Sequence, residues 1–385
     1  MRFDLIINGA GLVGASLAVA LRASRLSIAL VDARAPEFGL GWDTRIYALS
    51  PKSQRLLDEI GVWRHLDAAR ITPVHDMEIF GDTGARLDFS AYAAGVPALA
   101  FIVEQNLILR ELWESVRRQS NVTLFVPGEP AQLSTDDHTA RLTLQDGRTL
   151  EGGLIVGADG AQSWVRQHAG LESNFTPYHA RGVVANFATE KPHHHRAFQW
   201  FREDGILAFL PLPGNMMSMV WSAPDALADE LMSLSPEALA ERVAAAGGHA
   251  LGTLQALSAP AAFALRLGRV PQIHAPRVVL IGDAAHVVHP LAGHGVNLGF
   301  GDVASLAGIL AAAPAWRDVG EPGLLRRHAR SRAEEVALMQ AGTHLLARLF
   351  GAKHAMLSTL RNTGMSLINR SQAARQFLTR IALDT

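Results

Sequence analysis

The 385-residue chain contains no cysteine. This absence excludes disulfide bonds, thiolate zinc sites, iron–sulfur clusters and cysteine nucleophiles. It suits a cytoplasmic protein, which is the localisation we expect. Long apolar runs are missing as well. No run of 18 or more apolar residues is free of charges and glycine breaks, so a membrane-spanning helix is not expected.

The chain also has little net charge, −1 at pH 7, so nothing in the total points to a nucleic-acid partner. Apolar residues make up 49% and charged residues 18% of the chain, which is typical of a globular protein and not of a disordered one. Its length of 385 residues favours two or three domains over a single core.

The strongest pattern at the start of the chain is LIINGAGLVGASLAVALRASRLSIALVDAR. Its apolar character would suit a signal peptide. However, Asp4 interrupts the basic region that such a peptide needs, and the glycines break the apolar run. Residues 3–7 instead predict a buried parallel strand, and residues 15–21 predict a helix of small and apolar residues.

Between this strand and this helix stand Gly9, Gly11 and Gly14, which form GxGxxG. The first glycine permits a tight turn, the second lets backbone approach a pyrophosphate, and the third lets helix and strand pack closely. A second strand, 27–31, ends at Asp32 about 20 residues further on, where an acid meets the ribose hydroxyls. The segment therefore predicts a dinucleotide site.

Two further strand–turn–helix passages follow, LIVGADGAQSWVR and RVVLIGDAAHVVHPLAGHGVNLGFGDVASLAGIL. The first places Asp159 in a tight turn after a strand at 154–156. The second places Asp283 after a strand at 278–281, where its carboxylate is suited to accept a hydrogen bond from a sugar-like hydroxyl. Residues 290–295 contain two glycines and would bring backbone amides against a flat ring, before a helix over 296–310.

Together these three motifs resemble those of the flavoprotein aromatic hydroxylases, the superfamily of p-hydroxybenzoate hydroxylase. Within it the chain is most similar to the FAD-dependent ring hydroxylases of ubiquinone biosynthesis, through DTRIYALSPKSQRLLDEIGVW, IVEQNLILRELW, GILAFLPLP and DVASLAGIL. The resemblance covers nearly the whole chain.

The resemblance implies a set of FAD contacts. One departure is His294, where these hydroxylases usually carry Gln. The implied contacts are Gly9, Gly11 and Gly14 at the pyrophosphate, Asp32 at the adenosine ribose, Arg45 at the phosphates or over the flavin, Gln105 near the adenosine half, Asp159 in a structural and nucleotide-linked role, Asp283 at the ribityl and pyrophosphate region, and Pro290, Gly293, His294, Gly295, Val296 and Asn297 along the isoalloxazine.

Simpler interpretations stand beside several of these assignments. Asp159 is suited to stabilise a turn only, and Arg45 to form a surface salt bridge. His286, His289 and His294 are close enough to suggest a metal, but no partnering carboxylate is evident, so we expect no metal site. The run at 193–195 is interpreted as a solvated loop.

The resemblance also implies an α/β fold with a discontinuous layout. A Rossmann-like FAD-binding domain would comprise residues 1–72, 96–177 and 262–325. An inserted antiparallel-sheet substrate domain would comprise 73–95 and 178–261, and 326–385 would form C-terminal helices. The period-two pattern of the inserted sheet is clearest in MSMVWS. The substrate pocket would lie where this sheet covers the flavin.

The implied activity is monooxygenation of the aromatic ring of a polyprenylated phenol in ubiquinone biosynthesis. Reduced FAD would form a C4a-hydroperoxide with O2, and NAD(P)H or another reductant would supply electrons. The sequence singles out no catalytic acid or base. Alternatives are a hydroxylase of a small soluble aromatic compound, an FAD-dependent oxidase or reductase of the same fold, and a flavin-binding scaffold without turnover that associates with other quinone-biosynthesis proteins.

The tail from 343 to 383 is basic and contains no Asp or Glu, and its apolar residues recur at helical spacing. Such a helix can lie on an anionic bilayer, which predicts peripheral contact with the inner face of the membrane. The alternative, which we favour, is that the apolar stripe packs on the FAD domain and the basic face is solvated.

Overall fold

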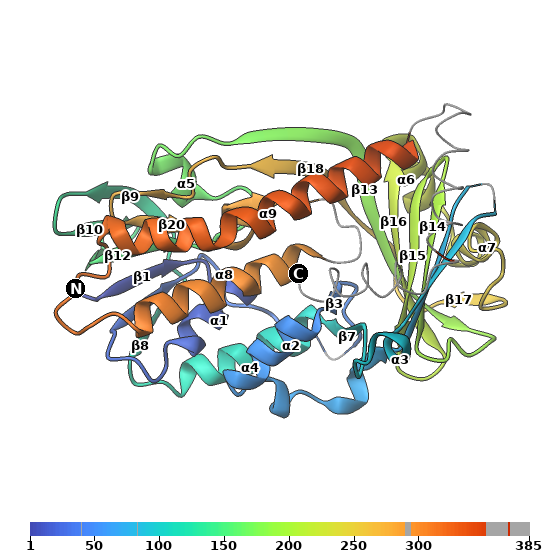
Figure 1. The fold of residues 1–385 in the computed structure, drawn as a ribbon, viewed down its shortest axis with the longest axis horizontal. Helices are drawn as coiled ribbons and strands as arrows, with labels where there is room; N and C mark the ends of the chain where they lie inside the picture. Colours follow the sequence, from blue (N-terminus) through green and yellow to red (C-terminus); the bar gives the residue numbers. More distant parts are fainter. Residues whose placement is uncertain (40, 83, 289–293, 352–368, 370–385) are drawn as a thin grey trace.

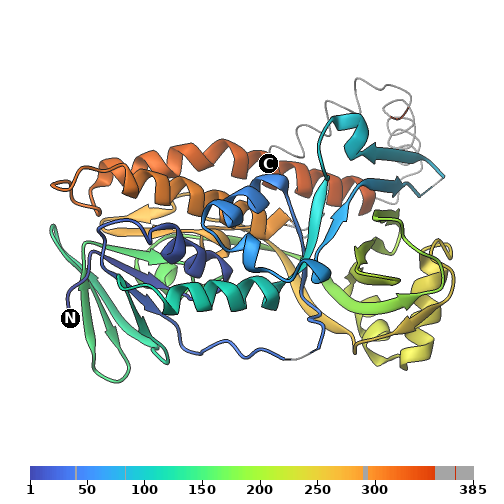
Figure 2. The same cartoon turned by 90° about the horizontal axis from the view of Figure 1, so that it is seen from below.

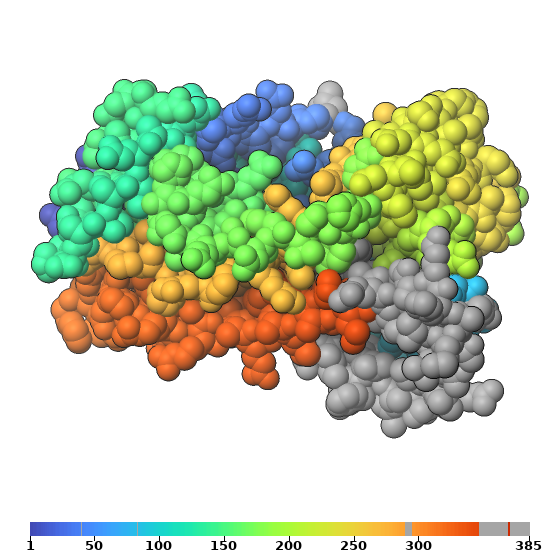
Figure 3. All heavy atoms as spheres, turned by 90° about the horizontal axis from the view of Figure 1, so that it is seen from above, coloured from blue at the N-terminus to red at the C-terminus, as the bar shows by residue number. Residues whose placement is uncertain are grey.

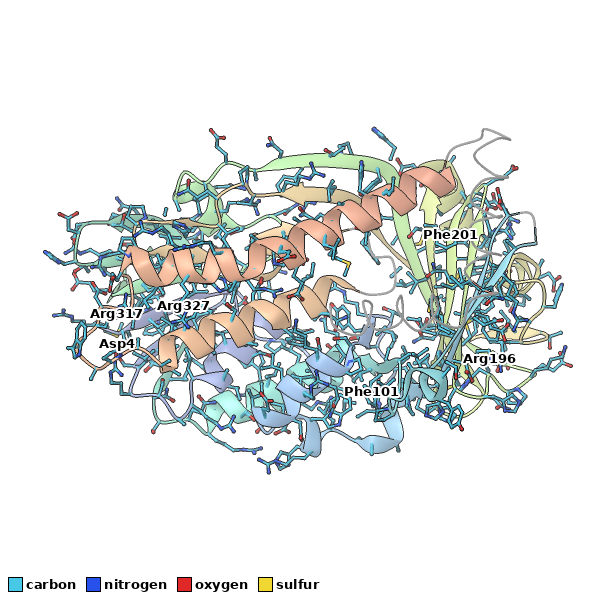
Figure 4. All side chains as sticks on the ribbon, in the orientation of Figure 1. Asp4, Phe101, Arg196, Phe201, Arg317 and Arg327 are labelled. Atoms are coloured by element: carbon cyan, nitrogen blue, oxygen red, sulfur yellow. The ribbon has the colours of Figure 1, made fainter. Side chains whose placement is uncertain are left out.

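The computed structural model describes residues 1–39, 41–82, 84–288, 294–351 and 369. A six-stranded sheet with its helices lies at one end of the molecule and a large antiparallel sheet at the other (Figure 1). The long helix α9 (Pro322–Gly351) runs from the first end toward the large sheet. Figure 4 marks the two ends: Arg317 and Arg327 lie at the first, and Arg196 and Phe201 at the second. The expected α/β class is confirmed.

The six-stranded sheet has the order β19-β20-β12-β1-β2-β8. The pairs from β20 to β8 are parallel, and β19 is antiparallel to β20. The strands predicted at 3–7, 27–31, 154–156 and 278–281 all occur, with ends shifted by one or two residues. Their bounds are β1 (Leu5–Asn8), β2 (Ile28–Val31), β8 (Val122–Phe125), β12 (Leu154–Gly157), β19 (His274–Ala275) and β20 (Val278–Leu280).

Successive side chains of β1 point to opposite faces of this sheet, and each face is covered by different elements. Leu5 and Ile7 join a core with several helices, whereas Ile6 joins a core with a small sheet on the opposite face. That small sheet has the order β11-β10-β9 and is antiparallel. The helices in the core on the other face include α1 (Leu12–Ala20), α4 (Gln105–Arg117) and α8 (His294–Ala311). The small-sheet strands are β9 (Pro130–Thr135), β10 (Ala140–Leu144) and β11 (Thr149–Gly152).

A second small sheet, in the order β3-β7-β4, lies between the two ends of the molecule (Figure 1). It joins a core with residues of the large sheet, among them Ala197 and Leu212. It therefore connects the dinucleotide-type region with the large sheet. Its strands are β3 (Ile46–Leu49), β4 (Thr72–Val74) and β7 (Ala100–Glu104).

The large sheet has the order β21-β18-β13-β16-β15-β14-β5-β6, and β17 also pairs with β13. The two strands nearest one edge come from a segment far earlier in the chain than the rest, as Figure 2 shows. All its pairs are antiparallel except β14 with β5. Its strands are β5 (Asp76–Phe80), β6 (Arg86–Ser90), β13 (Asn174–Thr189), β14 (Arg196–Arg202), β15 (Gly205–Leu212), β16 (Met216–Pro224), β17 (Leu254–Ala256), β18 (Ala261–Arg269) and β21 (His286–Val287).

Two helices cover the outer face of the large sheet, α6 and α7. The helix predicted to end at Gly247-Gly248 is α7, which caps its N-terminus with Ser235 and begins at a proline. The helix predicted over 296–310 begins two residues earlier, as α8. The remaining helices are α2 (Pro51–Glu59), η1 (Trp63–His65), η2 (Ala68–Arg70), α3 (Ala91–Ala94), α5 (Trp164–His168), α6 (Asp225–Ser233), α7 (Pro236–Ala246) and η3 (Gly282–Ala284).

The C-terminal helix α9 forms one edge of the molecule in the space-filling view of Figure 3. Within the residues that the structure describes, no helix combines the length and apolar character needed to cross a bilayer. Most of the basic tail, including Arg361, Arg370 and Arg375, lies outside the described residues.

Candidate active site

The glycine loop between β1 and α1 packs against the second motif with no room for side chains. Gly9 has φ +107°, and a Cβ built on it would lie 2.3 Å from the Ala158 carbonyl oxygen. A Cβ on Gly14 would lie 1.9 Å from the Gly9 carbonyl oxygen. Any other residue at these two positions must move the backbone, so the loop holds β1, β12 and α1 at close approach.

Gly11 differs from its neighbours because it faces open space. A Cβ built on it would meet nothing within 4 Å. It is the N-cap of α1, it has no side chain to cap the helix, and the first turn of α1 contains no acidic residue. The first amides of α1 therefore remain available to an anion beside open space, which is what a pyrophosphate requires.

Asp32, at the end of β2, stabilises this loop. Its Oδ2 accepts a hydrogen bond from the Ala10 amide at 2.7 Å, and its Oδ1 accepts one from the Arg34 amide at 3.1 Å. The Trp113 indole of α4 donates to the Ala10 carbonyl at 2.9 Å. Sequence reasoning missed Trp113, because its partner is 103 residues away and no local pattern marks it.

Asp159 is used within its own turn. It accepts hydrogen bonds from Asn8 Nδ2 at 3.1 Å, from the Ser163 hydroxyl at 2.5 Å and from the Val165 amide at 3.0 Å. Ser163 in turn caps α5 by accepting from the Arg166 amide. Asp159 thus ties β1 to the start of α5, which is the structural half of its expected role.

The third motif reaches the glycine loop through Val13 of α1. Gly282 has φ +61°, and a Cβ on it would lie 3.1 Å from Val13 Cγ2. A Cβ on Gly299 of α8 would lie 2.6 Å from the same atom. All three motifs, far apart in the chain, therefore meet around α1.

Asp283, next to Gly282, reaches solvent although protein atoms surround it closely. Desolvation by these neighbours raises the pKa of its carboxyl above its usual range, although the charges of His286 and Arg266 oppose the shift. An accessible carboxylate in an enclosed position is suited to bind a ligand hydroxyl.

Tyr47 of β3 connects two of the predicted residues, and sequence reasoning missed it. Its hydroxyl donates to Gln105 Oε1 at 3.0 Å. Burial, followed by the negative charge of Asp283, raises its pKa to about 12, so the hydroxyl stays protonated at neutral pH. Gln105 and Asp283 therefore both act on Tyr47, the first through a hydrogen bond and the second through its charge.

Known proteins match this chain along almost its whole length. A family model described as an FAD binding domain matches residues 2–341. The chain belongs to the FAD binding domain family. Ubiquinone hydroxylase UbiL of Rhodospirillum rubrum is 32% identical, with 99% of this chain and 90% of the relative covered. The 3-demethoxyubiquinol 3-hydroxylase of Escherichia coli is 31% identical, with 99% and 98% covered.

A crystal structure of a PqsL variant from Pseudomonas aeruginosa superposes with a TM-score of 0.80 at 25% identity, covering 95% of this chain and 99% of that one. The protein is accordingly an FAD-dependent monooxygenase. Its cofactor is FAD, and O2 and a reductant are the co-substrates of this class. The open cradle at Gly11 and the accessible carboxylate of Asp283 fit this cofactor.

Arg45 is exposed and lies two residues before Tyr47 in the chain. Its amide donates to Asp43 Oδ1 at 3.0 Å, and its charge acts on Tyr47. The surface salt bridge considered for it does not occur among the described residues. The guanidinium is thus available for an FAD phosphate or for the flavin.

Asn297 of α8 uses its whole amide on the protein. Its Oδ1 accepts from the Ser50 amide and its Nδ2 donates to the Ala48 carbonyl, both at 2.9 Å. Its side chain therefore fixes the end of β3 against α8. Gly295 and Val296 lie half-buried in the first turn of α8, where His294 begins the helix. Pro290 and Gly293, and the side chain of His294, lie outside the described residues.

Asp302 of α8 is the centre of a buried charge network that sequence reasoning missed. Its Oδ2 accepts from the Gly282 amide at 2.8 Å and from His286 Nε2 at 2.6 Å. Its Oδ1 accepts from Arg332 Nε of α9 at 2.7 Å. Despite desolvation, the charges and hydrogen bonds of His286 and Arg332 hold the pKa of Asp302 well below its usual range. Helices α8, through Asp302, and α9, through Arg332, thus position the GDAAH turn that carries Asp283.

The metal alternative gains no support from the part of the chain that is described, which contains no group of three or more potential His, Cys, Asp or Glu ligands. His289 lies outside that part. The interpretation of 193–195 as a solvated loop is wrong for His193, which is buried and hydrogen-bonded through Nε2 to the Leu212 carbonyl at 2.7 Å. His193 instead anchors the turn to β15, whereas His194 and His195 are exposed.

Proposed function

We propose that the protein hydroxylates the aromatic ring of a polyprenylated phenol in ubiquinone biosynthesis. The observation that carries this proposal is the near-complete coverage of two relatives named as ubiquinone or demethoxyubiquinol hydroxylases, at 31–32% identity. The arrangement of the three motifs supports it, because they meet at one cradle beside the large sheet.

We assign roles to the residues of this site as follows. When bound, FAD supplies the redox chemistry that activates O2 for transfer to the ring. The α1 amides near Gly11 bind the pyrophosphate, and Asp283 binds the ribityl chain. Tyr47 orients Gln105. The protein's own contribution is positioning and the exclusion of water, with no side chain assigned as a catalytic acid or base.

The discontinuous domain layout remains our proposal: an FAD-binding domain from 1–72, 96–177 and 262–325, a substrate domain from 73–95 and 178–261, and a C-terminal region from 326–385. The large sheet supports this division, because β5, β6 and β14–β17 lie wholly within the inserted segments. β13 and β18 cross the boundaries and link the two domains.

A turnover experiment tests the activity. The purified protein is reconstituted with FAD, supplied with reductant, O2 and a short-chain prenylated phenol, and the products are analysed by mass spectrometry. We expect a product heavier by one oxygen, labelled when ¹⁸O2 is used. Turnover of unprenylated phenols only would identify a hydroxylase of small soluble aromatics. FAD binding with no product from any phenol would identify a scaffold.

The composition of the tail alone favours packing on the FAD domain. Because a polyprenylated substrate resides in the bilayer, however, we also propose peripheral membrane contact through the basic tail. The support is the tail's composition, which includes Arg361, Arg370 and Arg375 and lacks acidic residues from 343 to 383. Association with other quinone-biosynthesis proteins is a further part of this proposal.

A further inference from the structure

The two faces of the large sheet differ in how tightly they are covered. On the face toward α6 and α7, Phe209 and Met219 are 2% and 0% exposed. On the opposite face, toward β3-β7-β4, the neighbouring residues Ala208, Leu210 and Val220 remain partly accessible. This inner face is therefore apolar but not fully packed, as a site for an apolar ligand requires.

Asn186 of β13 is a buried polar residue on the inner face, only 1% exposed. Its Nδ2 donates to the Asp43 carbonyl at 2.9 Å, in the loop that precedes Arg45. This bond sets the orientation of the Asn186 side-chain amide, because the Asp43 carbonyl can accept a hydrogen bond only from its NH2 group and not from its oxygen. Its Oδ1 is thereby directed elsewhere, and it has no hydrogen-bond partner among the described residues.

Ser218 of β16 stands directly opposite Asn186 in the antiparallel register. It also stands opposite Leu210 of β15, which belongs to the core shared with β3, β4 and β7. Directly opposed residues share a face, so Ser218 lies on the inner face beside Asn186. Its side chain is 0% exposed, and its Oγ has no hydrogen-bond partner in the described chain.

Two neighbouring buried oxygens thus lack partners, which is costly unless a ligand supplies them. Asn186 Oδ1 accepts only, whereas the Ser218 hydroxyl can donate or accept. A group that both donates and accepts satisfies the two together. A phenolic hydroxyl is such a group, while a carboxylate would repel Oδ1 and an aryl methyl ether has no proton to donate.

We infer that Asn186 and Ser218 form the recognition pair for a free ring hydroxyl of the substrate. The hydroxyl donates to Asn186 Oδ1 and accepts from Ser218 Oγ, and the partly accessible apolar residues of the inner face accommodate the ring and the start of its prenyl chain. This inference rests on the proposed function and narrows it. The substrate must present an unmethylated hydroxyl at the ring position that meets the sheet.

The test measures binding without turnover. Wild-type protein loaded with oxidised FAD is titrated anaerobically, in the absence of reductant, with 2-prenylphenol and with its methyl ether 2-prenylanisole, and Kd is obtained from the change in the flavin absorbance. We expect the phenol to bind more tightly than the ether. Ser218→Ala should weaken phenol binding by about 3- to 10-fold, the effect of one hydrogen bond, and leave ether binding unchanged.

Ser222→Ala is the matched control, since Ser222 lies on the same strand and the same face but opposite Gly182. It should leave both constants unchanged. Ser218→Ala should also retain or increase the free energy of unfolding, because it removes a buried hydroxyl without a partner. If the variant is as stable as the wild type, a loss of phenol binding cannot be attributed to misfolding.

Two results for Ser218→Ala would overturn the pair: an equal fold loss of phenol and ether binding, or no loss of either. The second result would mean that only a buried water satisfies the two oxygens. The proposed function is judged separately by the oxygenated product of wild-type turnover. Product formation with an unchanged ratio rejects the pair alone, whereas a Ser218-dependent ratio without product rejects the hydroxylase activity alone.

Discussion

The carboxylate of Asp302 in α8 and the imidazole of His286 in β21 form a buried hydrogen bond of 2.6 Å, although the two residues lie 16 positions apart in the chain. Burial opposes a charged imidazole, but the negative charge of Asp302 dominates and raises the pKa of His286. Arg332 adds a second positive charge from α9. The negative charge of Asp302, on helix α8, therefore holds the GDAAH turn in place.

Asp302→Ala should strongly destabilise the protein, because it removes the buried carboxylate that His286 and Arg332 share, although Arg332 keeps its ion pair with Glu335. Breaking a buried pair in this way costs about 3–5 kcal/mol. Chemical denaturation measures the loss, and FAD titration should show weaker binding because the Gly282 amide loses its acceptor. Asp146→Asn, at an exposed ion pair with Arg148, is the control and should change neither quantity appreciably. Equal effects of the two substitutions would contradict the assigned role.

His328 should make stability dependent on pH. Burial lowers its pKa from 6.5 to about 4 in the folded state, and Asp302 opposes this shift. A lowered histidine pKa means that the unfolded chain binds more protons, so this stability is fully present above the unfolded pKa and is lost as pH falls from about 6.5 to 4. The full contribution is about 3 kcal/mol.

The measurement is urea denaturation at pH 7 and pH 5 for wild type and His328→Gln. The wild type should lose more stability at pH 5 than the variant does, since glutamine does not titrate. His65→Gln, at an exposed position, should keep the wild-type difference between the two pH values. If His328→Gln also keeps that difference, the dependence arises elsewhere.

Gly11 and Gly14 should separate FAD binding from folding. Gly14→Ala forces a Cβ against the Gly9 carbonyl, so it should reduce the free energy of unfolding by about 1–3 kcal/mol and weaken FAD binding. Gly11→Ala meets no protein atom, so it should fold normally and yet weaken FAD binding by about tenfold or more, a loss of roughly 1.4 kcal/mol. Fluorescence titration with FAD and thermal melts provide both readings. Wild-type affinity in Gly11→Ala would place the pyrophosphate elsewhere.

Asp283→Ala should weaken FAD binding without a large cost in stability. Its carboxylate reaches solvent and has no hydrogen bond to another described residue, so its removal should cost the protein without FAD little stability. We expect a nearly unchanged melting temperature without FAD, and a smaller rise in melting temperature when FAD is added. A wild-type rise on FAD addition would show that Asp283 does not contact the cofactor.

Neutralising Arg361, Arg370 and Arg375 together should release the protein from anionic vesicles. Each basic residue near such a surface contributes roughly 1 kcal/mol, so three should change binding by about a hundredfold. Salt should have the same effect on the wild type, because screening acts over about 8–10 Å. Vesicle co-sedimentation measures both, with FAD content as the control. Loss of FAD with unchanged vesicle binding would mean that the tail packs on the protein.

Much of the fold and part of the site could be predicted because their signals are local. Strands β1, β2, β12 and β20 are short apolar runs in the sequence. The close packing at Gly9 and Gly14 can be predicted because both glycines belong to one tight strand-to-helix turn. Asp159 was recognised in its turn because its partners Ser163 and Val165 are a few residues away.

The remaining residues could not be found in this way, because their roles depend on contacts between distant segments. Trp113 acts by donating a hydrogen bond to the Ala10 carbonyl, and Asn186 by donating one to the Asp43 carbonyl, 143 residues away. Arg332 acts by donating one to the Asp302 carboxylate. The polar neighbours of His193 predict a solvated loop, yet its hydrogen-bond partner, the Leu212 carbonyl, lies in strand β15. Burial of a polar side chain is a tertiary property that one sequence does not display.

The strand order of the six-stranded sheet determines when the cofactor site can exist during protein synthesis. β1 emerges from the ribosome first, but its neighbour β12 follows about 150 residues later and β20 more than 270 residues later. Arg332, which adds the second positive charge beside Asp302, emerges later still. Parallel pairing over such separations forms late in folding. FAD is therefore a ligand of the nearly finished chain, and it cannot assist the folding of the nascent N-terminal segment that carries the first glycine motif.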